Sequence, residues 1–506
     1  NKSNTISMNE FLQNQLTSRN ALIGAGALAA AYTLRSLYRS SQLPPGPLGL
    51  PLLGRLPWLD TDHFNESEEA MRQKYGPIYS FRAGQRLMIV VSSYEMLKEM
   101  LKDDMFSGRL WPPQAAELSN GCGIIFSEGK TWSEQRRVGL RMLREFGFGK
   151  NESLALINEE VAAILASIES CNSEVDSSRL LSDLANCVIA MLVFGKRYAN
   201  ENPNYESFLI NAKKLLNDSL ASSLTLLFPT FAPLLKRLSI TQQASTATLA
   251  MHQFFEEEIK KKEAELTDPN AEPLCICDAY IQERRRYEAK GDFYTHRPFH
   301  LVRICMEMFI AGTDTTSKSM EWLLAHMCLY PQVQAKVQQE LDEVVGRERR
   351  PQINDRPQLH YMQAVIDESL RYASLAFNSL THRAMKHTTF RGYRIPADAI
   401  IVPFVYGAHR DASIWEKPDQ FYPEHFLDCE GEYSPSKYLI PFSIGRRICP
   451  GESLARLEIY MAFAAIMQKY SVTLAASCKD KAADIERGMT TTPRQPGWHK
   501  LDFVQR

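Results

Sequence analysis

Two short runs of hydrophobic residues near the beginning of the chain predict a small β-sheet. The runs cover residues 78–81 and 87–91, and the second is rich in β-branched side chains, which favour strands. Gly84 and Gln85 lie between the runs and are suited to a turn. We therefore expect two strands joined by a turn at this point of the chain.

A helical pattern of hydrophobic positions dominates the later part of the chain. It runs from about Pro298 to Tyr330, where Pro331 prevents its extension, and a helix of this length is expected to cross the whole molecule. Hydrophobic residues then recur at helical spacing at Val333, Val337, Leu341 and Val344. Gly346 is suited to end that second helix. The predicted fold class is mainly α with small β-sheets.

One charged segment is expected to be a solvent-exposed helix. Three glutamates each precede a lysine by four residues, at Glu256, Glu257, Glu258, Lys260, Lys261 and Lys262. Such pairs stabilise a helix by about 0.2–0.5 kcal/mol each. The charges are therefore interpreted as a surface face and not as a binding site.

The N-terminal region contains a candidate membrane anchor. Residues 21–34 form an apolar run of 14 residues, whereas a spanning helix requires about 20. Arg35 and Arg39 follow it, as is typical of a cytoplasmic flank, and a proline-rich hinge occupies residues 43–47. We expect a tail with a membrane anchor over residues 1–40 and one folded domain over residues 41–506. An amphipathic presequence is the alternative for the first segment.

Composition and charge narrow the class of protein. The chain has 506 residues, 44% of them hydrophobic and 23% charged, which is ordinary for a globular protein with a large core. Its formal net charge of −1 argues against nucleic acid as a partner. The ten cysteines lack paired spacing apart from Cys275 and Cys277, so a reducing compartment is expected.

The segment over residues 442–451 combines residue types suited to presenting one cysteine to a haem iron. Gly445 can adopt positive φ in a tight turn, and Arg447 is placed to meet an anionic haem propionate. Pro450 is suited to the first position of a helix that follows Cys449. The positive end of that helix favours an ionised sulfur. A buried structural cysteine beside a basic turn is the alternative.

The same segment matches F-x-x-G-x-R-x-C-x-G, and the chain thereby resembles the cytochrome P-450 superfamily. The match covers every specified position from Phe442 to Gly451. Further segments resemble the family in the expected order, at residues 132–136, 311–316, 368–371 and 421–426. The resemblance runs from about Pro44 to the C-terminus, and it is closest to animal microsomal members.

This resemblance implies a cofactor and the residues that hold it. The cofactor is haem b, iron protoporphyrin IX, with the Cys449 thiolate as axial ligand of the iron. A thiolate ligand favours O–O bond cleavage. The other residues implied to bind the cofactor are Trp132, Arg136, His382, Phe442, Gly445, Arg447 and Gly451. For His382 a satisfied core histidine is an equal alternative.

The resemblance also assigns roles within the long helix. Asp314 and Thr315 are implied to deliver protons to bound dioxygen, since a hydroxyl can donate while an acidic neighbour links to water. The alternative for Thr315 is a hydroxyl bonded to a carbonyl one turn earlier. Small residues such as Gly312 would let the helix lie flat against the haem.

Three residues are implied to support the haem loop without taking part in catalysis. Glu368 and Arg371 lie on one helical face, and the family buries this pair together with a third residue, usually arginine. In this chain the third position is His425, so the charge of the third partner is left open. A buried pair of this kind must be fully hydrogen-bonded to be tolerated.

The implied substrate pocket is hydrophobic. Its lining, by position in the family, includes Phe309, Ile310, Ala311, Ala376 and Phe377, with further residues from 111–124 and near Met489. No lysine or arginine stands out there to bind an acidic group. A lipophilic small molecule is therefore expected, without a distinction among steroid, fatty acid, terpenoid and foreign compound.

The implied activity is that of a haem-thiolate monooxygenase, which hydroxylates or epoxidises its substrate with dioxygen as co-substrate. Electrons are implied to come from NADPH through NADPH–cytochrome P-450 reductase, with cytochrome b5 as an additional donor. A haem-thiolate isomerase or dehydratase and a non-catalytic haem-based binding protein are the alternatives. The location implied is the endoplasmic reticulum membrane with a cytoplasmic catalytic domain; a mitochondrial location is the alternative.

A basic stripe beside Arg136 is a candidate docking site for the reductase. Arg137, Arg141 and Arg144 follow one another at helical spacing. Complementary charge would steer the encounter with an acidic partner and would weaken with salt. A plain solvated face is the alternative.

Overall fold

A computed structural model describes most of the chain. It covers residues 42–60, 62–110, 121–146, 151–171, 174–197, 224–268, 270–293, 297–491 and 493–506. The main helices are α2 (Phe64–Tyr75), α3 (Tyr94–Lys102), α5 (Gly129–Phe146), α6 (Asn151–Ser170), α7 (Ser177–Phe194), α11 (Ser239–Glu265), α12 (Ile276–Glu288), α13 (Pro298–Leu329), α14 (Pro331–Val344), α15 (His360–Ala373) and α17 (Glu452–Lys469). Shorter helices are α10 (Ala232–Leu235), α16 (Val405–Ala408) and α18 (Ala482–Arg487). The predicted anchor over residues 1–40 lies outside the described residues.

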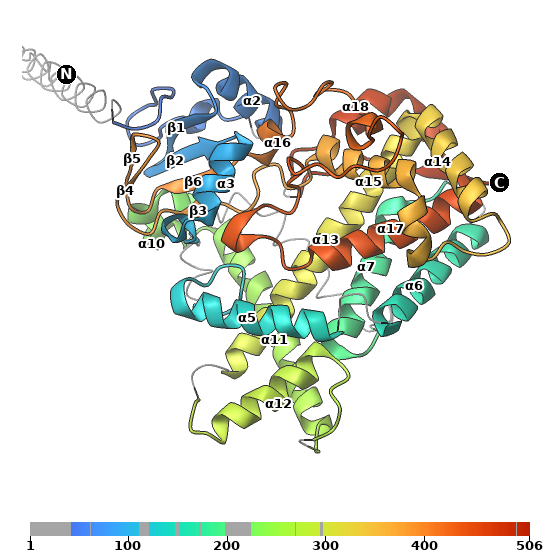
Figure 1. Ribbon diagram of the computed structural model, residues 1–506. Helices are drawn as coiled ribbons and strands as arrows, with labels where there is room; N and C mark the ends of the chain where they lie inside the picture. The colour runs from blue at the N-terminus through green and yellow to red at the C-terminus, as the bar shows by residue number, and fades with distance from the viewer. Residues whose placement is uncertain are drawn as a thin grey trace, which may run out of the picture.

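The strands β1 to β6 lie toward one side of the molecule, the last strand ends beside the C-terminus on the other side, and helices fill the space between (Figure 1). One sheet has the strand order β1 (Ile78–Ala83), β2 (Arg86–Val91), β6 (Ile400–Pro403), β3 (His382–Arg383). Within it, β2 and β6 run parallel and the other neighbours antiparallel. Two further pairs are β4 (Thr388–Phe390) with β5 (Tyr393–Ile395), and β7 (Tyr470–Leu474) with β8 (Leu501–Gln505). The predicted strands β1 and β2 are confirmed, as is the mainly helical fold class.

The long helix α13 crosses the molecule and organises the core (Figure 1). It begins at Pro298, where the missing N–H costs nothing, and ends before Pro331, as predicted. Its main neighbour is α7, with α11, α15 and α17 also packed against it. The Thr313 hydroxyl donates to Asn186 Oδ1 of α7 at 2.9 Å. This bond fixes the rotation of α13 about its own axis.

Gly312 is required by the approach of α7. A Cβ built on Gly312 would lie 2.7 Å from Ile189 Cδ1, closer than van der Waals packing permits. The absence of a side chain therefore allows α7 and α13 to pack closely. The expectation that Gly312 lets the helix lie flat against the haem is corrected, because this position faces α7.

The charged segment of α11 differs in part from its prediction. Glu256 and Lys260 form the expected ion pair at 3.0 Å on the surface. Glu258, however, is buried and binds Lys196 at 2.5 Å and Lys261 at 2.8 Å. This face of α11 therefore fastens the helix to the chain after α7, which the local spacing of charges could not indicate.

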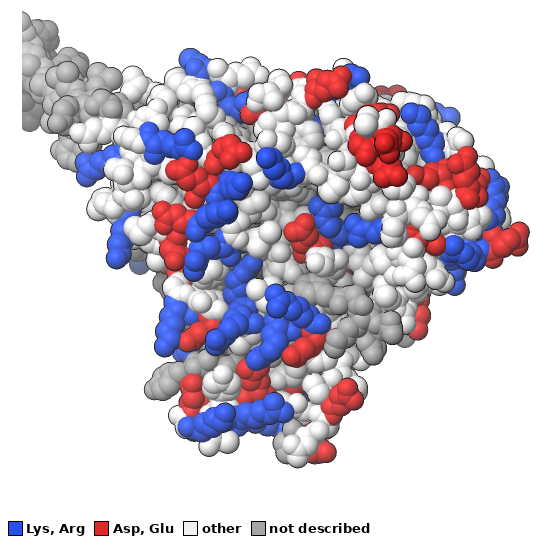
Figure 2. All heavy atoms as spheres, viewed as in Figure 1, with Lys and Arg blue, Asp and Glu red and all other residues white. Residues whose placement is uncertain are grey.

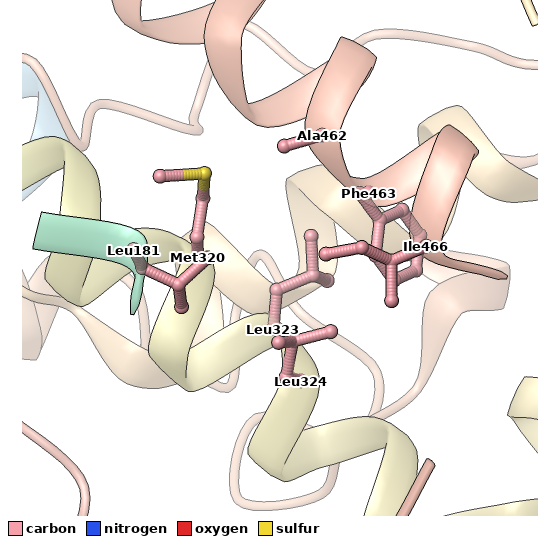
Figure 3. Close-up of a pocket in the computed structure, with 7 residues that line it drawn as sticks. All are labelled: Leu181, Met320, Leu323, Leu324, Ala462, Phe463 and Ile466. Carbon is pink, nitrogen blue, oxygen red and sulfur yellow. The ribbon is translucent and has the colours of Figure 1, made fainter. Parts of the chain in front are cut away.

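A narrow apolar gap lies where α7, α13 and α17 meet (Figure 3). It is too small to admit a water molecule. Its lining is entirely hydrophobic: Leu181, Met320, Leu323, Leu324, Ala462, Phe463 and Ile466. The gap is a packing defect of the core, and none of the predicted site residues borders it.

Glu368 and Arg371 of α15 form the buried pair that the sequence predicts. Both side chains are 0% exposed, and Arg371 Nε donates to Glu368 Oε2 at 2.7 Å. Arg371 Nη2 also donates to Glu368 Oε1 at 2.8 Å, and the other N–H groups donate to the backbone carbonyls of His409, Pro418 and Gln420. The pair is therefore fully hydrogen-bonded, which is the condition for tolerating buried charge.

His425 completes this network as a neutral partner. Its Nδ1 lies 3.2 Å from Glu368 Oε2, and its Nε2 accepts from the Lys417 amide at 3.3 Å. A ring whose Nε2 accepts carries its proton on Nδ1, so His425 donates to the carboxylate without adding charge. The Tyr422 amide also donates to Glu368, at 2.7 Å. Through these bonds α15 holds the irregular segment that precedes the cysteine loop.

We expect Glu368→Gln to destabilise the fold strongly. The substitution leaves Arg371 without its counter-charge in a dry site, which costs about 3–5 kcal/mol. Urea denaturation followed by circular dichroism would measure the loss in free energy of unfolding.

Glu66→Gln is the matched control, because its pair with Arg487 is about half exposed. Such surface pairs contribute at most about 1 kcal/mol. Equal losses for the two variants would contradict a special role for the buried network.

Candidate functional site

The cysteine loop is a tight turn held by its own backbone. Residues Gly445–Arg447 form a 3-10 turn, and Gly445 has φ of 81°. A Cβ on Gly445 would lie 2.2 Å from the carbonyl oxygen of Leu101 at the end of α3. The Cys449 amide then donates to the Phe442 carbonyl at 3.0 Å and closes the loop. Only glycine fits position 445, for both reasons.

The helix predicted after the loop is α17, and it starts slightly later than expected. Gly451 is its N-cap and Glu452 its first residue. Pro450 therefore lies before the helix and not at its first position. The amides of Gly451 and Glu452 remain free of helical bonds and donate to the Cys449 sulfur.

The Cys449 sulfur experiences opposing electrostatic effects. Its side chain is accessible from one side, while protein atoms surround it on the others. Burial raises the pKa of the thiol; the amides of Gly451 and Glu452 and the charge of Arg136 lower it, and the Glu452 carboxylate raises it. Arg136 Nη2 donates to the Ile448 carbonyl at 2.5 Å, beside the cysteine. Amide donors and a guanidinium group are what a thiolate requires.

The middle of α13 has an accessible stripe in an otherwise buried helix. Ala311 and Thr315, one turn apart, are exposed, and Asp314 is half-buried. The Thr315 hydroxyl donates to the Ala311 carbonyl at 2.6 Å, which is the local bond that the sequence left as an alternative. Helix α13 also packs against α17, the helix that follows the loop of Cys449. The hydroxyl can serve a bound molecule only by rotating away from Ala311.

Arg447 projects from the cysteine loop into a cluster with Trp132 and Arg136 of α5. Its guanidinium carbon lies 4.0 Å from the centre of the Trp132 ring. Its N–H groups donate to the backbone carbonyls of Ser107, Ile124 and Ser127 at 2.6–3.1 Å. Burial and the charges of Arg109 and Arg136 together lower the pKa of Arg447 to about 9. The cluster thus gathers positive charge inside the protein.

Arg109 belongs to this cluster and was not predicted from the sequence. It is buried, and its guanidinium donates to the carbonyls of Ile125, Leu380 and Thr381 at 2.8–3.2 Å. Burial and the charge of Arg136 together lower the pKa of Arg109 to about 10, against the opposing effect of the Glu128 carboxylate. Like charges gathered at a buried site favour a bound anion. No local pattern around position 109 signals this, because its partners come from distant segments.

Two buried ring nitrogens in the cluster have no hydrogen-bond partner, namely Trp132 Nε1 and His382 Nε2. Buried polar groups are rarely left in this state. A haem propionate would accept from Trp132 directly. The Nδ1 of His382 lies 2.6 Å from the Phe106 carbonyl, so Nε2 of the neutral ring carries no proton. His382 would therefore meet a carboxylate as imidazolium, against the burial that lowers its pKa to about 3.

The residues present therefore fit a haem. Three guanidinium groups and the unpartnered Trp132 Nε1 match two carboxylates, whereas the unprotonated Nε2 of His382 does not. An accessible sulfur bordered by amide donors matches an iron ligand. A ligand that suits this site must therefore carry both carboxylates and a metal that binds sulfur. Among small molecules of biology, a metalloporphyrin with propionate side chains combines them.

The predicted pocket residues divide into two groups. Ala311 is exposed, and Ile310 and Ala376 are partly buried. Phe309 instead packs against Phe255 of α11, with ring centres 5.8 Å apart, and Phe377 packs against Phe64 at 6.1 Å. Both rings lie in the packed core, so these two residues support the pocket wall from behind.

A second acidic residue of α13 anchors the segment that follows residue 120. Glu307 is buried and accepts from the amides of Ile124 and Ile125 at 2.6 and 3.0 Å. Arg447 binds the carbonyls of the same segment from the other side. The predicted pocket residues 111–120 lie outside the described residues.

The predicted basic stripe is exposed on α5. Arg137, Arg141 and Arg144 all point to solvent, and Arg141 also pairs with Glu283 of α12. Figure 2 shows Lys and Arg side chains gathered over α5 and over α12 on this face. The stripe lies on the helix that supplies Trp132 and Arg136 to the cluster.

Comparison with known proteins agrees with this site. The family model of cytochrome P450 matches residues 44–500. Cytochrome P450 2C20 of Macaca fascicularis is 32% identical over 478 residues, covering 91% of this chain and 95% of the relative. Cytochrome P450 2H1 of Gallus gallus is 32% identical, covering 92% and 94%, and cytochrome P450 2A5 of Mus musculus is 30% identical, covering 97% and 100%. The chain therefore belongs to the cytochrome P450 family and is a haem-thiolate monooxygenase.

Proposed function

We propose that this protein binds haem b through Cys449 and inserts one atom of dioxygen into a lipophilic small molecule, by hydroxylation or epoxidation. The observation that carries the proposal is the pairing of an amide-bordered sulfur at Cys449 with the cluster of Arg109 and Arg447, which are buried, and Arg136, which is partly exposed. When bound, the haem supplies the activation of dioxygen. The protein supplies the ligand, orients the substrate and moves protons.

Each candidate residue has a defined task in this proposal. Cys449 ligates the iron, while Trp132, Arg136, Arg447 and Arg109 hold the propionates. Ala311 leaves room for dioxygen, and Ile310 and Ala376 contact the substrate. Asp314 and Thr315 move protons into the site, with Thr315 releasing its bond to the Ala311 carbonyl to do so.

The proposed electron donor is NADPH–cytochrome P-450 reductase, and cytochrome b5 is a second proposed donor. Exposed Arg137 and Arg144 support an acidic partner on the face of α5. The same helix carries Arg136, whose side chain reaches the residue before Cys449. A partner bound there would lie close to the haem, and its association would weaken with salt.

The proposed location is the membrane of the endoplasmic reticulum, with residues 1–40 as the anchor and 41–506 as the catalytic domain. In the described part of the chain, α7 alone is long and apolar enough to span a bilayer, but it is a mostly buried core helix. A better indication is a tight hairpin in which Leu50 and Gly54 exchange backbone hydrogen bonds at 2.8–2.9 Å. The hairpin and its surroundings present apolar side chains to solvent, from Leu48, Leu50, Leu52, Leu53 and Trp58.

A second apolar segment lies near this hairpin. Phe231, Leu234 and Leu238 are exposed, and the chain before them is bound to the β1–β2 turn, where the Gln85 amide donates to the Leu227 carbonyl at 2.8 Å. The hairpin is bound to the same end of β1, since the Arg55 amide donates to the Arg82 carbonyl at 2.7 Å. The two segments thus form one apolar surface, of the kind that marks membrane contact.

The proposed activity is tested first at the iron ligand. Reduced wild-type protein treated with carbon monoxide should show the red-shifted absorption band of a thiolate-ligated haem, and Cys449→Ser should lose it. The buried thiol Cys478 offers a matched control, and Cys478→Ser should keep the band.

A second test concerns turnover, in which formation of oxygenated product must require both NADPH and reductase. Product formed without a reductase would indicate an isomerase, and spectral binding without turnover would indicate a binding protein.

We expect Arg109→Leu to weaken haem retention. The substitution removes one of the three positive charges of the cluster, and a charge-assisted hydrogen bond is worth about 1.5–3 kcal/mol, or about 10- to 150-fold in affinity. Transfer of haem to apomyoglobin, followed by absorbance, would measure the rate of loss. Arg109→Lys retains the charge, so its rate of haem loss should lie between that of the wild type and that of Arg109→Leu. Unchanged transfer in Arg109→Leu would remove this residue from the site.

We expect Thr315→Ala to uncouple electron use from product formation. Without the hydroxyl, proton delivery slows, and product formed per NADPH consumed should fall by about tenfold or more. Thr315→Ser keeps the hydroxyl and should restore coupling. A coupling ratio equal to that of the wild type in the alanine variant would exclude the proton role.

We expect Trp58 to lie within the lipid when the full chain is reconstituted into vesicles. Brominated lipid should quench part of the tryptophan fluorescence, and Trp58→Phe should abolish that part. Trp498 is equally exposed, at 59% against 58%, but lies near Lys481 instead of the apolar surface. Trp498→Phe should therefore leave the quenching unchanged. Quenching that survives Trp58→Phe would contradict the proposed orientation.

A further inference from the structure

A second charged network lies beside the Glu368–Arg371 pair and reaches the cysteine loop. Arg456 of α17 donates from Nη1 to Asp367 Oδ1 at 2.6 Å and from Nε to Glu452 Oε1 at 3.1 Å. Asp367 is almost fully buried and also accepts from the Tyr433 hydroxyl. Asp367 therefore faces α17, while its neighbour Glu368 faces the segment before the loop.

Arg456 is linked to Cys449 along two routes. Its guanidinium carbon lies 5.2 Å from the centre of the Phe442 ring, and the Phe442 carbonyl accepts from the Cys449 amide. Its partner Glu452 places a backbone amide on the Cys449 sulfur and a carboxylate near it. The carboxylate repels negative charge on the sulfur, and Arg456 offsets that repulsion by pairing with it.

We propose that Arg456 is a positioning residue that tunes the Cys449 thiolate as an iron ligand. It does so by holding the Phe442 ring and by neutralising Glu452 beside the sulfur. This inference rests on the proposed haem-thiolate site. It adds a residue outside the cysteine loop to the control of the haem potential.

The sign of the effect follows from charge. Reduction of a thiolate-ligated ferric haem adds one negative charge to the site, so a nearby cation favours the reduced form and a nearby anion disfavours it. Removing the positive charge of Arg456 should lower the midpoint potential. Removing the negative charge of Glu452 should raise it. If Arg456 only joined α15 to α17, the two substitutions would not shift the midpoint potential in opposite directions.

The test is a redox titration of the reconstituted full-length protein, with absorbance reporting the ferric and ferrous forms. Arg456→Met should shift the midpoint potential down, and Glu452→Gln should shift it up. Arg456→Lys keeps the charge and should stay close to the wild type. Glu452 is about one-third exposed, so its variant should fold even if Arg456→Met does not.

Shifts in the same direction for Arg456→Met and Glu452→Gln would overturn the inference, as would the absence of any shift. If Arg456→Met does not fold, an unchanged or lowered potential in Glu452→Gln overturns it alone, and a raised potential supports it. The carbon monoxide spectrum of the wild type distinguishes a failure of this inference from a failure of the proposed function. A wild type without the red-shifted band has no thiolate ligand to tune.

Discussion

Three guanidinium groups gathered beside the cysteine loop impose the main electrostatic constraint on this structure. Arg109 and Arg447 are buried and Arg136 is partly exposed. They come from three separate parts of the chain, and their like charges repel one another. Backbone carbonyls hold two of them in place without cancelling their charge. The carboxylates of Glu128 and Glu307 offset part of this charge, and the propionates of the proposed haem would offset more of it. In this proposal the haem is both a cofactor and a counter-charge.

The two acidic residues of helix α15 have different tasks. Glu368 binds Arg371, His425 and the Tyr422 amide, which stabilises the irregular segment leading to the loop. Asp367 binds Arg456 of α17, which stabilises the helix leaving the loop. Adjacent residues of one helix therefore hold both sides of the turn that carries Cys449. The position of Cys449, the proposed iron ligand, is therefore determined by buried polar contacts on either side of the loop as well as by the backbone bond that closes it.

Sequence patterns predicted the elements whose signals are local. Proline at both ends defined α13, and the spacing of small and polar residues located the accessible stripe at Ala311 and Thr315. The contribution of Arg109 could not be predicted, since it arises where distant carbonyls converge on one side chain. The neutral state of His425 likewise depends on an amide contributed by Lys417. Residue types along the chain indicated the chemistry of the site. The protonation state of His425 and the gathering of positive charge at Arg109 depend on segments that the fold brings together.

The contact between Gly312 and Ile189 limits how the active site of this protein can diversify. A methyl group at position 312 would press on the end of the Ile189 side chain, which would have to shift beside the bond between Thr313 and Asn186. A larger side chain would meet more of the interface between α7 and α13. Altered selectivity in laboratory evolution is therefore expected to arise at other positions while residue 312 stays small.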